Sequence, residues 1–169
     1  MSCPSCADIK KHIIEHAIIH DEDESSISDI KVDGGRLWVY DGVRDKWLSS
    51  DRQFALAGRD GRAKNLYLRL LDGQPSNLTG YRMLRNATIV ALAAQTRNIE
   101  TWTLQIRKNG DPTSVYSLTI SGASGAHNKL VDIDVDEGDL VQMFAETTNF
   151  LGIKDPFVMI EIAWRNDTL

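Results

Sequence analysis

The sequence contains few cysteines and no long apolar run. Only Cys3 and Cys6 occur among its 169 residues, so disulfide bonds cannot hold the body of the chain together. No apolar stretch is long enough to cross a bilayer, and the N-terminus lacks the pattern of a secretory signal. We therefore expect a soluble protein that is made in the cytoplasm, does not insert into membranes and is stabilised by one hydrophobic core.

Basic residues are in the minority. Nineteen Lys and Arg side chains stand against 24 Asp and Glu side chains, which gives a net charge of -5. Acidic residues gather at 21–24 and at 132–139. Because this balance opposes contact with a phosphate backbone, we expect no nucleic-acid partner.

The first twenty residues have the pattern of an amphipathic helix. Residues 7–20 contain no Gly or Pro. Their apolar side chains fall on one half of a helix at about 100° per residue, namely Ile9, Ile13, Ile14, Ala17 and Ile18. This pattern predicts a short helix that anchors the chain to a partner, followed by an exposed acidic linker that ends at residue 29.

The same segment contains a set of metal-ligand residues. Cys3, Cys6, His12 and His16 are the kind of ligands that tetrahedral zinc prefers. Only five residues separate the two pairs, fewer than the dozen or so of zinc fingers, so the cysteine turn would have to fold back over the helix. A dithiol redox pair and plain surface residues are alternatives. His20 extends the histidines to a stripe, either a solvated flank or a line near the axis of a threefold bundle. We expect no required cofactor, with zinc as an optional reinforcement of the N-terminus.

From residue 30 onward, the sequence pattern has a period of two. In the segment "TWTLQIRKNG", Trp102, Leu104 and Ile106 share one face, and Asn109-Gly110 offers a tight hairpin turn. Short strands recur about every ten residues between turns rich in Gly, Asp and Asn. We predict a mainly β fold, an antiparallel β-sandwich of the jelly-roll type preceded by the short N-terminal α-helix.

One predicted strand, "ATIVALAAQ" at 87–95, is apolar on both faces. Alternation places Ile89, Ala91 and Ala93 on one face and the residues between them on the other. A strand of a two-layer sandwich meets its own core with one face only, and alanine permits close approach of a neighbour. Ile89, Ala91 and Ala93 are therefore predicted to form a subunit interface; the alternative is a strand covered by a long loop.

Two further clusters are weak candidates for a metal site and a catalytic site. One strand face carries three carboxylates, at Asp132, Asp134 and Asp136. Calcium would need ligands from other loops there, and a solvated strand face is the simpler interpretation. Another segment holds two serines and a histidine, at Ser121, Ser124 and His127. It lacks the strand-to-helix elbow of a hydrolase, so we expect no enzymatic activity.

Four segments of the body, in their order, resemble the trimeric jelly-roll heads of the complement and tumour necrosis factor type. These segments are "RNATIVALAAQT", "TWTLQIRKNG", "VDEGDLVQMFAE" and "VMIEIAWR". Such heads also occur on bacteriophage fibres, on phage capsid-decoration proteins and on spore-surface proteins. The segment "GGRLWVYDGVRDKWLSS" looks like the β-hairpin that precedes such heads in phage structural proteins, with Trp38, Tyr40 and Trp47 as its packing aromatics.

The resemblance implies a homotrimeric structural protein of a bacteriophage virion, with the interface strand at the trimer contacts. It divides the chain into a helical anchor and linker (1–29), a leading β-hairpin region (30–65) and a jelly-roll head (66–169). As a tail fibre or knob, the protein would attach through its N-terminus to baseplate or tail proteins and contact a host surface receptor. As a capsid-decoration (cement) protein, it would stabilise the phage head. A lectin-like module with Tyr81 and Phe150 as sugar-stacking aromatics is a third alternative.

Overall fold

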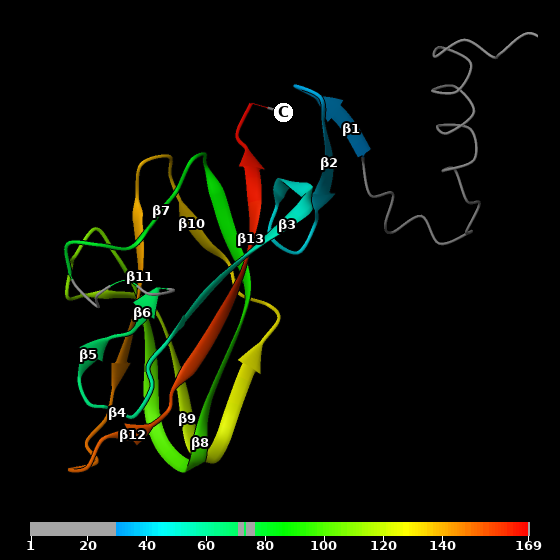
Figure 1. Cartoon of the computed structure of the whole chain (residues 1–169). Helices are drawn as coiled ribbons and strands as arrows, with labels where there is room; N and C mark the ends of the chain where they lie inside the picture. The colour runs from blue at the N-terminus through cyan, green and yellow to red at the C-terminus, as the bar shows by residue number, and fades with distance from the viewer. Residues whose placement is uncertain (1–29, 71–72, 74–76, 169) are drawn as a thin grey trace, which may run out of the picture.

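The computed structural model describes residues 30–70, 73 and 77–168, and these residues form an antiparallel β structure (Figure 1). The predicted mainly β fold is confirmed. The predicted anchor helix and the Cys3, Cys6, His12 and His16 set lie outside the described residues. The strands are β1 (Ile30–Asp33), β2 (Arg36–Asp41), β3 (Lys46–Gly58), β4 (Arg62–Ala63), β5 (Leu66–Tyr67), β6 (Arg69–Leu70), β7 (Tyr81–Arg82), β8 (Ala87–Lys108), β9 (Ser114–Asn128), β10 (Ile133–Val135), β11 (Leu140–Glu146), β12 (Ile153–Lys154) and β13 (Phe157–Asn166).

Most of these strands belong to one large sheet. Its central order is β1-β2-β3-β13-β8-β11-β5, with β9 and β10 also paired to β8, β6 to β3 and β7 to β11. Strands β4 and β12 form a separate two-stranded sheet. The sheet curls, because the first part of the long strand β8 pairs with β13 and its second part pairs with β11.

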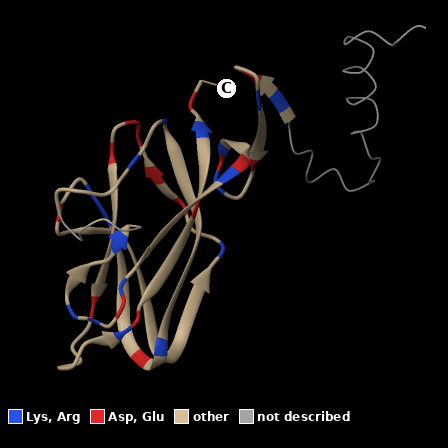
Figure 2. Cartoon of the chain, in the orientation of Figure 1, with Lys and Arg blue, Asp and Glu red and all other residues tan. Residues whose placement is uncertain are grey.

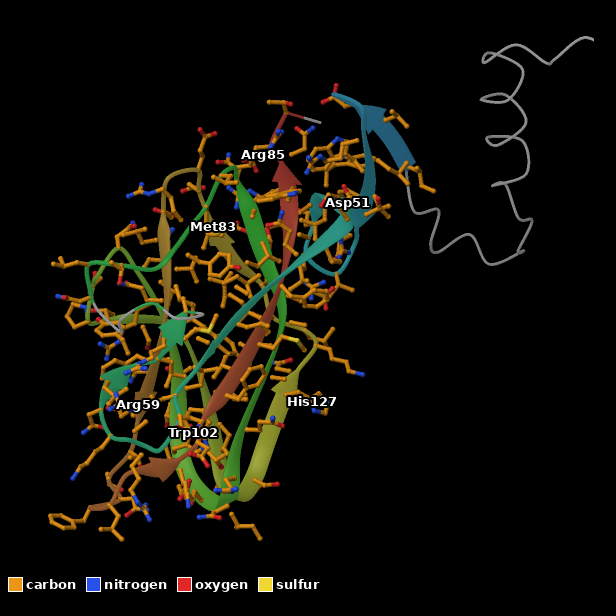
Figure 3. All side chains as sticks on the ribbon, viewed as in Figure 1. Asp51, Arg59, Met83, Arg85, Trp102 and His127 are labelled. Atoms are coloured by element: carbon orange, nitrogen blue, oxygen red, sulfur yellow. The ribbon has the colours of Figure 1, made fainter. Side chains whose placement is uncertain are left out.

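The core lies inside this curl. The predicted inward face of the second half of β8 is confirmed, since Trp102, Leu104 and Ile106 are buried there. They join one cluster with the inward residues of the other strands, and Figure 3 shows Trp102 among these side chains. The predicted hairpin turn is also confirmed, because Asn109 and Gly110 have φ angles of 56° and 78° and connect β8 to β9. Positive φ at both central residues suits the right-handed twist of the paired strands.

The predicted leading hairpin is formed by β2 and β3. Trp38 is buried, and the Tyr40 and Trp47 rings meet edge to face with their centroids 5.4 Å apart. Strand β3 then continues to Gly58 and pairs along its length with β13. Strands β1, β2 and β3 therefore belong to the same large sheet as β13 and β8, whereas β4 pairs with β12 outside it.

The two ends of the molecule differ. Strand β1, where the described chain begins, lies at the same end as the C-terminus, and the Asn166 side-chain nitrogen lies 3.2 Å from an Asp33 carboxylate oxygen. The β4–β12 pair lies at the opposite end (Figure 1). This arrangement separates the N-terminal side of the domain from the loops around β12.

Candidate subunit interface

A β-bulge at Val90 decides which residues of the alanine-rich strand face outward. In the pairing of β8 with β13, Ala91 is opposite Glu161 and Ile89 is opposite Ile162, so Val90 has no partner of its own. The extra residue reverses the alternation of faces. Ile89 is fully buried in the core, whereas Ala91 is partly exposed on the other side of the sheet.

The prediction that Ile89 shares a face with Ala91 and Ala93 is therefore wrong. Ala93 is partly exposed like Ala91, and the two lie on the outward side of β8. The buried residues beyond the bulge are Leu92 and Ala94. Of the predicted interface residues, only the two alanines are available to a partner.

Arg44, in the turn between β2 and β3, holds the bulge. Its guanidinium group donates hydrogen bonds to the carbonyl oxygens of Val90 (2.8 Å), Val131 (2.7 Å) and Lys129 (3.2 Å). It also forms an ion pair of 2.5 Å with Asp41. Burial acts to raise the pKa of Asp41, but the hydrogen bonds and charge of Arg44 outweigh it, so this pKa lies below its ordinary value. One side chain thus ties the leading hairpin to the bulge and to the segment after β9.

Large apolar side chains of β3 and β13 lie on one side of the two alanines. Phe54 and Leu56 of β3 are 52% and 37% exposed, and Phe157 and Met159 of β13 are 41% and 38% exposed. The strand register places them side by side, because Met159 is opposite Leu56 on one side and Ala93 on the other. We call this surface the outer face, defined by Phe54, Leu56, Ala91, Ala93, Phe157 and Met159.

The outer face is hollowed along β8. A groove of about 550 Å³ is lined by Ala91 and Ala93 together with Phe54 and Met159. A second hollow of about 320 Å³ continues from Ala93 toward Phe157 and Gly125. The hollows follow from the small side chains in the middle of the strand, which leave space between the larger residues on either side.

Charged groups border the groove without filling it. Arg52 and Glu161 form an ion pair of 3.2 Å at its margin, and each side chain is about one third exposed. His127 and Lys129 line the side formed by β9 and the residues after it. Figure 2 shows the long strands mainly in tan, with charged residues gathered at loops and strand ends. An apolar face with a mixed charged margin is suited to association with another protein surface.

The weaker sequence clusters do not assemble into reactive sites. Ser121 and Ser124 precede His127 by six and three residues on the same strand, β9. At about 3.3 Å per residue, this spacing puts the Cα atoms of both serines roughly 10 Å or more from that of His127, and Ser124 falls on the opposite face of a regular strand. Figure 3 shows His127 on β9, near the edge of the sheet.

The three aspartates considered for calcium are neutralised by cationic side chains. Lys46 pairs with Asp132 and Asp134 at 2.6 and 2.9 Å, and Arg165 pairs with Asp134 and Asp136 at 3.0 and 2.9 Å. Burial raises the pKa of Asp134, but the hydrogen bond from Lys46 and other interactions outweigh it and lower this pKa. Within the described part of the chain, no group of three or more His, Cys, Asp or Glu residues is arranged to hold a metal ion.

The two aromatics considered for sugar binding lie apart. Tyr81 is paired with Val141 near the start of β11. Phe150 follows the end of that strand, in the turn before β12, and is 86% exposed. They therefore do not form one binding site.

Most residues of the outer face were not among those predicted from the sequence. Phe54 and Leu56 alternate with the buried Ala55 and Ala57, so β3 is a second strand that is apolar on both faces. That signal was available in the segment "FALAG". The position of Arg44 has no comparable signal, because its partners are carbonyl groups more than forty residues away in the sequence.

Comparison with known proteins finds little. Neither a known protein family nor a characterised protein matches the sequence. Among solved structures, the chain is similar to the tobacco streak virus coat protein, which was solved as a dimer. The TM-score is 0.38 and the sequence identity is 10%, and the similarity covers 70% of this chain and 88% of the coat protein. No helix in the described residues is both long and apolar enough to cross a membrane. A structural similarity with so low a TM-score does not indicate a function.

Proposed function

We propose that this protein is a non-enzymatic structural subunit of a bacteriophage virion and assembles as a homotrimer through its outer face. The observation that supports the assembly is the outer face itself, where four exposed large apolar side chains of β3 and β13 lie beside a groove that is lined by two alanines. Contiguous apolar surface of this kind marks an interaction site, and most soluble oligomers are symmetric assemblies of one chain. The virion assignment is supported by the resemblance of the four sequence segments to trimeric phage heads.

We place the protein in the tail, as a fibre or knob. The described chain starts at Ile30, at the end opposite to the β4–β12 pair (Figure 1). Residues 1–29 would attach this end to baseplate or tail proteins, and the loops around β12 would then face a host surface receptor. Three copies in one trimer would strengthen a weak individual contact through avidity. The alternative is a trimeric capsid-decoration protein that stabilises the phage head, and the copy number per virion distinguishes the two.

The proposed interface is tested by placing a charge in the middle of the outer face. Ala93 is directly opposite Met159 and His127, neither of which is acidic, and it is partly exposed, so Ala93→Glu can be solvated in a monomer. In a trimer the same carboxylate would be removed from water within a mainly apolar contact, which is unfavourable. We expect a trimeric native mass for the wild-type protein and a folded monomer for Ala93→Glu, measured by light scattering after size exclusion.

The matched control introduces the same charge at Leu84, which is 73% exposed and lies outside the outer face. Leu84→Glu should remain trimeric, with the same circular dichroism spectrum as the wild type. A fully trimeric Ala93→Glu protein would reject the outer face as the interface. A monomeric wild-type protein would reject the trimer itself.

A further inference from the structure

The end of the molecule opposite β1 carries a compact group of loops that the proposed interface does not use. It consists of residues 59–65 around β4, residues 97–100 in the bend of β8, and residues 149–155 around β12, and we call it the tip. Strand β4 pairs with β12 there, with Ile153 opposite Ala63. An ion pair of 3.3 Å between Arg97 and Asp155 connects the bend of β8 to this pair.

The turn that precedes β12 is held in one conformation. The backbone N–H of Leu151 donates to the Asn149 side chain at 3.0 Å, and the N–H of Gly152 donates to the Asn149 carbonyl at 3.0 Å. Gly152 has a φ of 73°, and a Cβ atom at this position would lie 2.6 Å from the carbonyl oxygen of Ala63. The turn thus packs so closely against β4 that no side chain fits at Gly152.

Apolar side chains project from this held turn into solvent. Phe150 is 86% exposed and Leu151 is 60% exposed. Ile99, in the neighbouring bend of β8, is 74% exposed. None of these three residues lines the hollows of the outer face. The tip therefore presents a projecting apolar surface and not a cavity for a small molecule.

Cationic side chains accompany these apolar residues. The tip contains five of them, Arg59, Arg62, Lys64, Arg97 and Lys154, against three acidic residues, Asp60, Glu100 and Asp155. The ammonium group of Lys64 lies 5.3 Å from the centre of the Phe150 ring. Arg62 donates hydrogen bonds to the carbonyl oxygens of Leu151 and Gly152 at 3.3 and 3.0 Å. A locally basic tip on a chain with a net charge of -5 is complementary to an anionic surface.

We propose that the tip binds the surface of an anionic lipid bilayer. Phe150 and Leu151 would enter the boundary between headgroups and acyl chains, and Lys64 and Arg62 would contact anionic headgroups. The aliphatic side chains Leu151 and Ile99 favour lipid over sugar, because sugars stack on aromatic faces, and Lys64 already lies over the single aromatic ring among these three exposed residues. The contact is peripheral and requires no membrane-spanning segment.

This inference deepens the proposed fibre role and rests on it for the outward orientation of the tip. The binding itself is a property of each subunit, so it is measured directly on the purified full-length protein. The probe is co-sedimentation with vesicles of phosphatidylcholine, with and without phosphatidylglycerol. We expect binding to the vesicles that contain phosphatidylglycerol and at least tenfold weaker binding to phosphatidylcholine alone.

Two variants separate the apolar and the charged parts of the contact. Replacing both Phe150 and Leu151 by Ser should weaken vesicle binding at least tenfold, since it removes the apolar area that enters the interface. Lys64→Glu should weaken it more than fivefold, because the change removes one cation and adds one anion near an anionic surface. Both changes lie at exposed positions, so the thermal unfolding midpoint should stay that of the wild type.

Matched controls come from the opposite end of the molecule. Leu84→Ser removes an equally exposed apolar side chain, and Arg85→Glu reverses a charge at the position labelled in Figure 3. Both should bind vesicles like the wild type. Wild-type binding that is absent, equal on neutral vesicles, or retained by the double serine variant would overturn the inference.

The native mass of the same sample separates this inference from the proposed function. A trimer that binds no vesicles would reject only the lipid contact. A monomer that binds anionic vesicles through the tip would reject only the trimer. Capture by a soluble sulfated polysaccharide without vesicle binding would assign the tip to carbohydrate and overturn the lipid proposal.

Discussion

At the scale of single residues, Asp139 shows how one carboxylate organises two turns. It accepts hydrogen bonds from Lys108 at 2.6 Å, Asn109 at 2.7 Å and the backbone N–H of Asp136 at 2.8 Å. These contacts join the turn after β8 to the turn before β11. Burial acts to raise the pKa of Asp139, but the hydrogen bonds from Lys108 and Asn109 outweigh it and lower the pKa to about 2.

This shift predicts a specific loss of stability in acid. The pKa of Asp139 is about 2 in the folded protein, below the value of about 3.9 for an unfolded chain. Its contribution, about 1 kcal/mol after allowance for solvent screening, is therefore full above pH 4 and disappears as the pH falls through 2. Asp139→Asn should be less stable than the wild type at pH 7, with a difference that shrinks toward pH 2, as measured by urea unfolding.

The control for this prediction is Asp60→Asn, at an exposed position of the tip. Its free energy of unfolding should match that of the wild type at pH 7. An Asp139→Asn protein that keeps a constant deficit from pH 7 to pH 2 would show that the side chain acts through shape and not through its charge.

At the scale of elements, the bulge in β8 and the turn between β2 and β3 depend on each other. The bulge leaves the Val90 carbonyl without a partner in β13, and this carbonyl accepts hydrogen bonds from Arg44 and from the N–H of Val131. An unsatisfied carbonyl in this half-buried setting would be costly. The hairpin therefore stabilises the local geometry that turns Ala91 and Ala93 outward.

Arg44→Gln tests this dependence. The shorter neutral side chain loses the ion pair with Asp41 and cannot reach the carbonyls of Val90, Val131 and Lys129 together. We expect a loss of about 2 to 4 kcal/mol in the free energy of unfolding, measured with urea. Arg85→Gln, at an exposed position, should change it by less than about 0.5 kcal/mol. An equally small change at Arg44 would show that the bulge is stable without the hairpin.

At the scale of the whole molecule, the structure separates three surfaces. The outer face lies along β3, β13 and β8, the tip lies around β12, and β1 marks the end where residues 1–29 join the described domain. An assembly through the outer face leaves both ends free for other contacts. In the proposed fibre, attachment, trimerisation and surface binding would therefore use different residues.

Zinc bound at the N-terminus would act on the assembly of the whole molecule. Cys3, Cys6, His12 and His16 supply ligands of the right kind. If zinc reinforces this segment, the purified trimer should carry zinc in a fixed ratio and should loosen when a strong chelator is added, as followed by native mass and metal analysis. Replacing both cysteines by serine should loosen the trimer in the same way when no chelator is present. A trimer that contains no metal and keeps its native mass in the chelator would show that trimerisation depends on the outer face alone.

Local alternation was sufficient for much of the fold. Trp102, Leu104 and Ile106 were assigned to the core because a strand has a period of two, and Asn109-Gly110 marked the hairpin because both residues adopt positive φ readily. The interface strand was only half predictable. Its alanines face outward as expected, but Ile89 does not, since a single bulged residue exchanges the faces on either side of it.

The sequence by itself determined a mainly β protein and its long hairpin, because these depend on neighbours within a few residues. Only the tertiary structure decided that Phe54 and Met159 border the groove at Ala93, since the register of β3, β13 and β8 joins residues far apart in the chain. It also decided that Lys64 lies over Phe150 and that Arg44 holds the bulge. Such contacts follow from strand pairing over long loops, which no local pattern encodes.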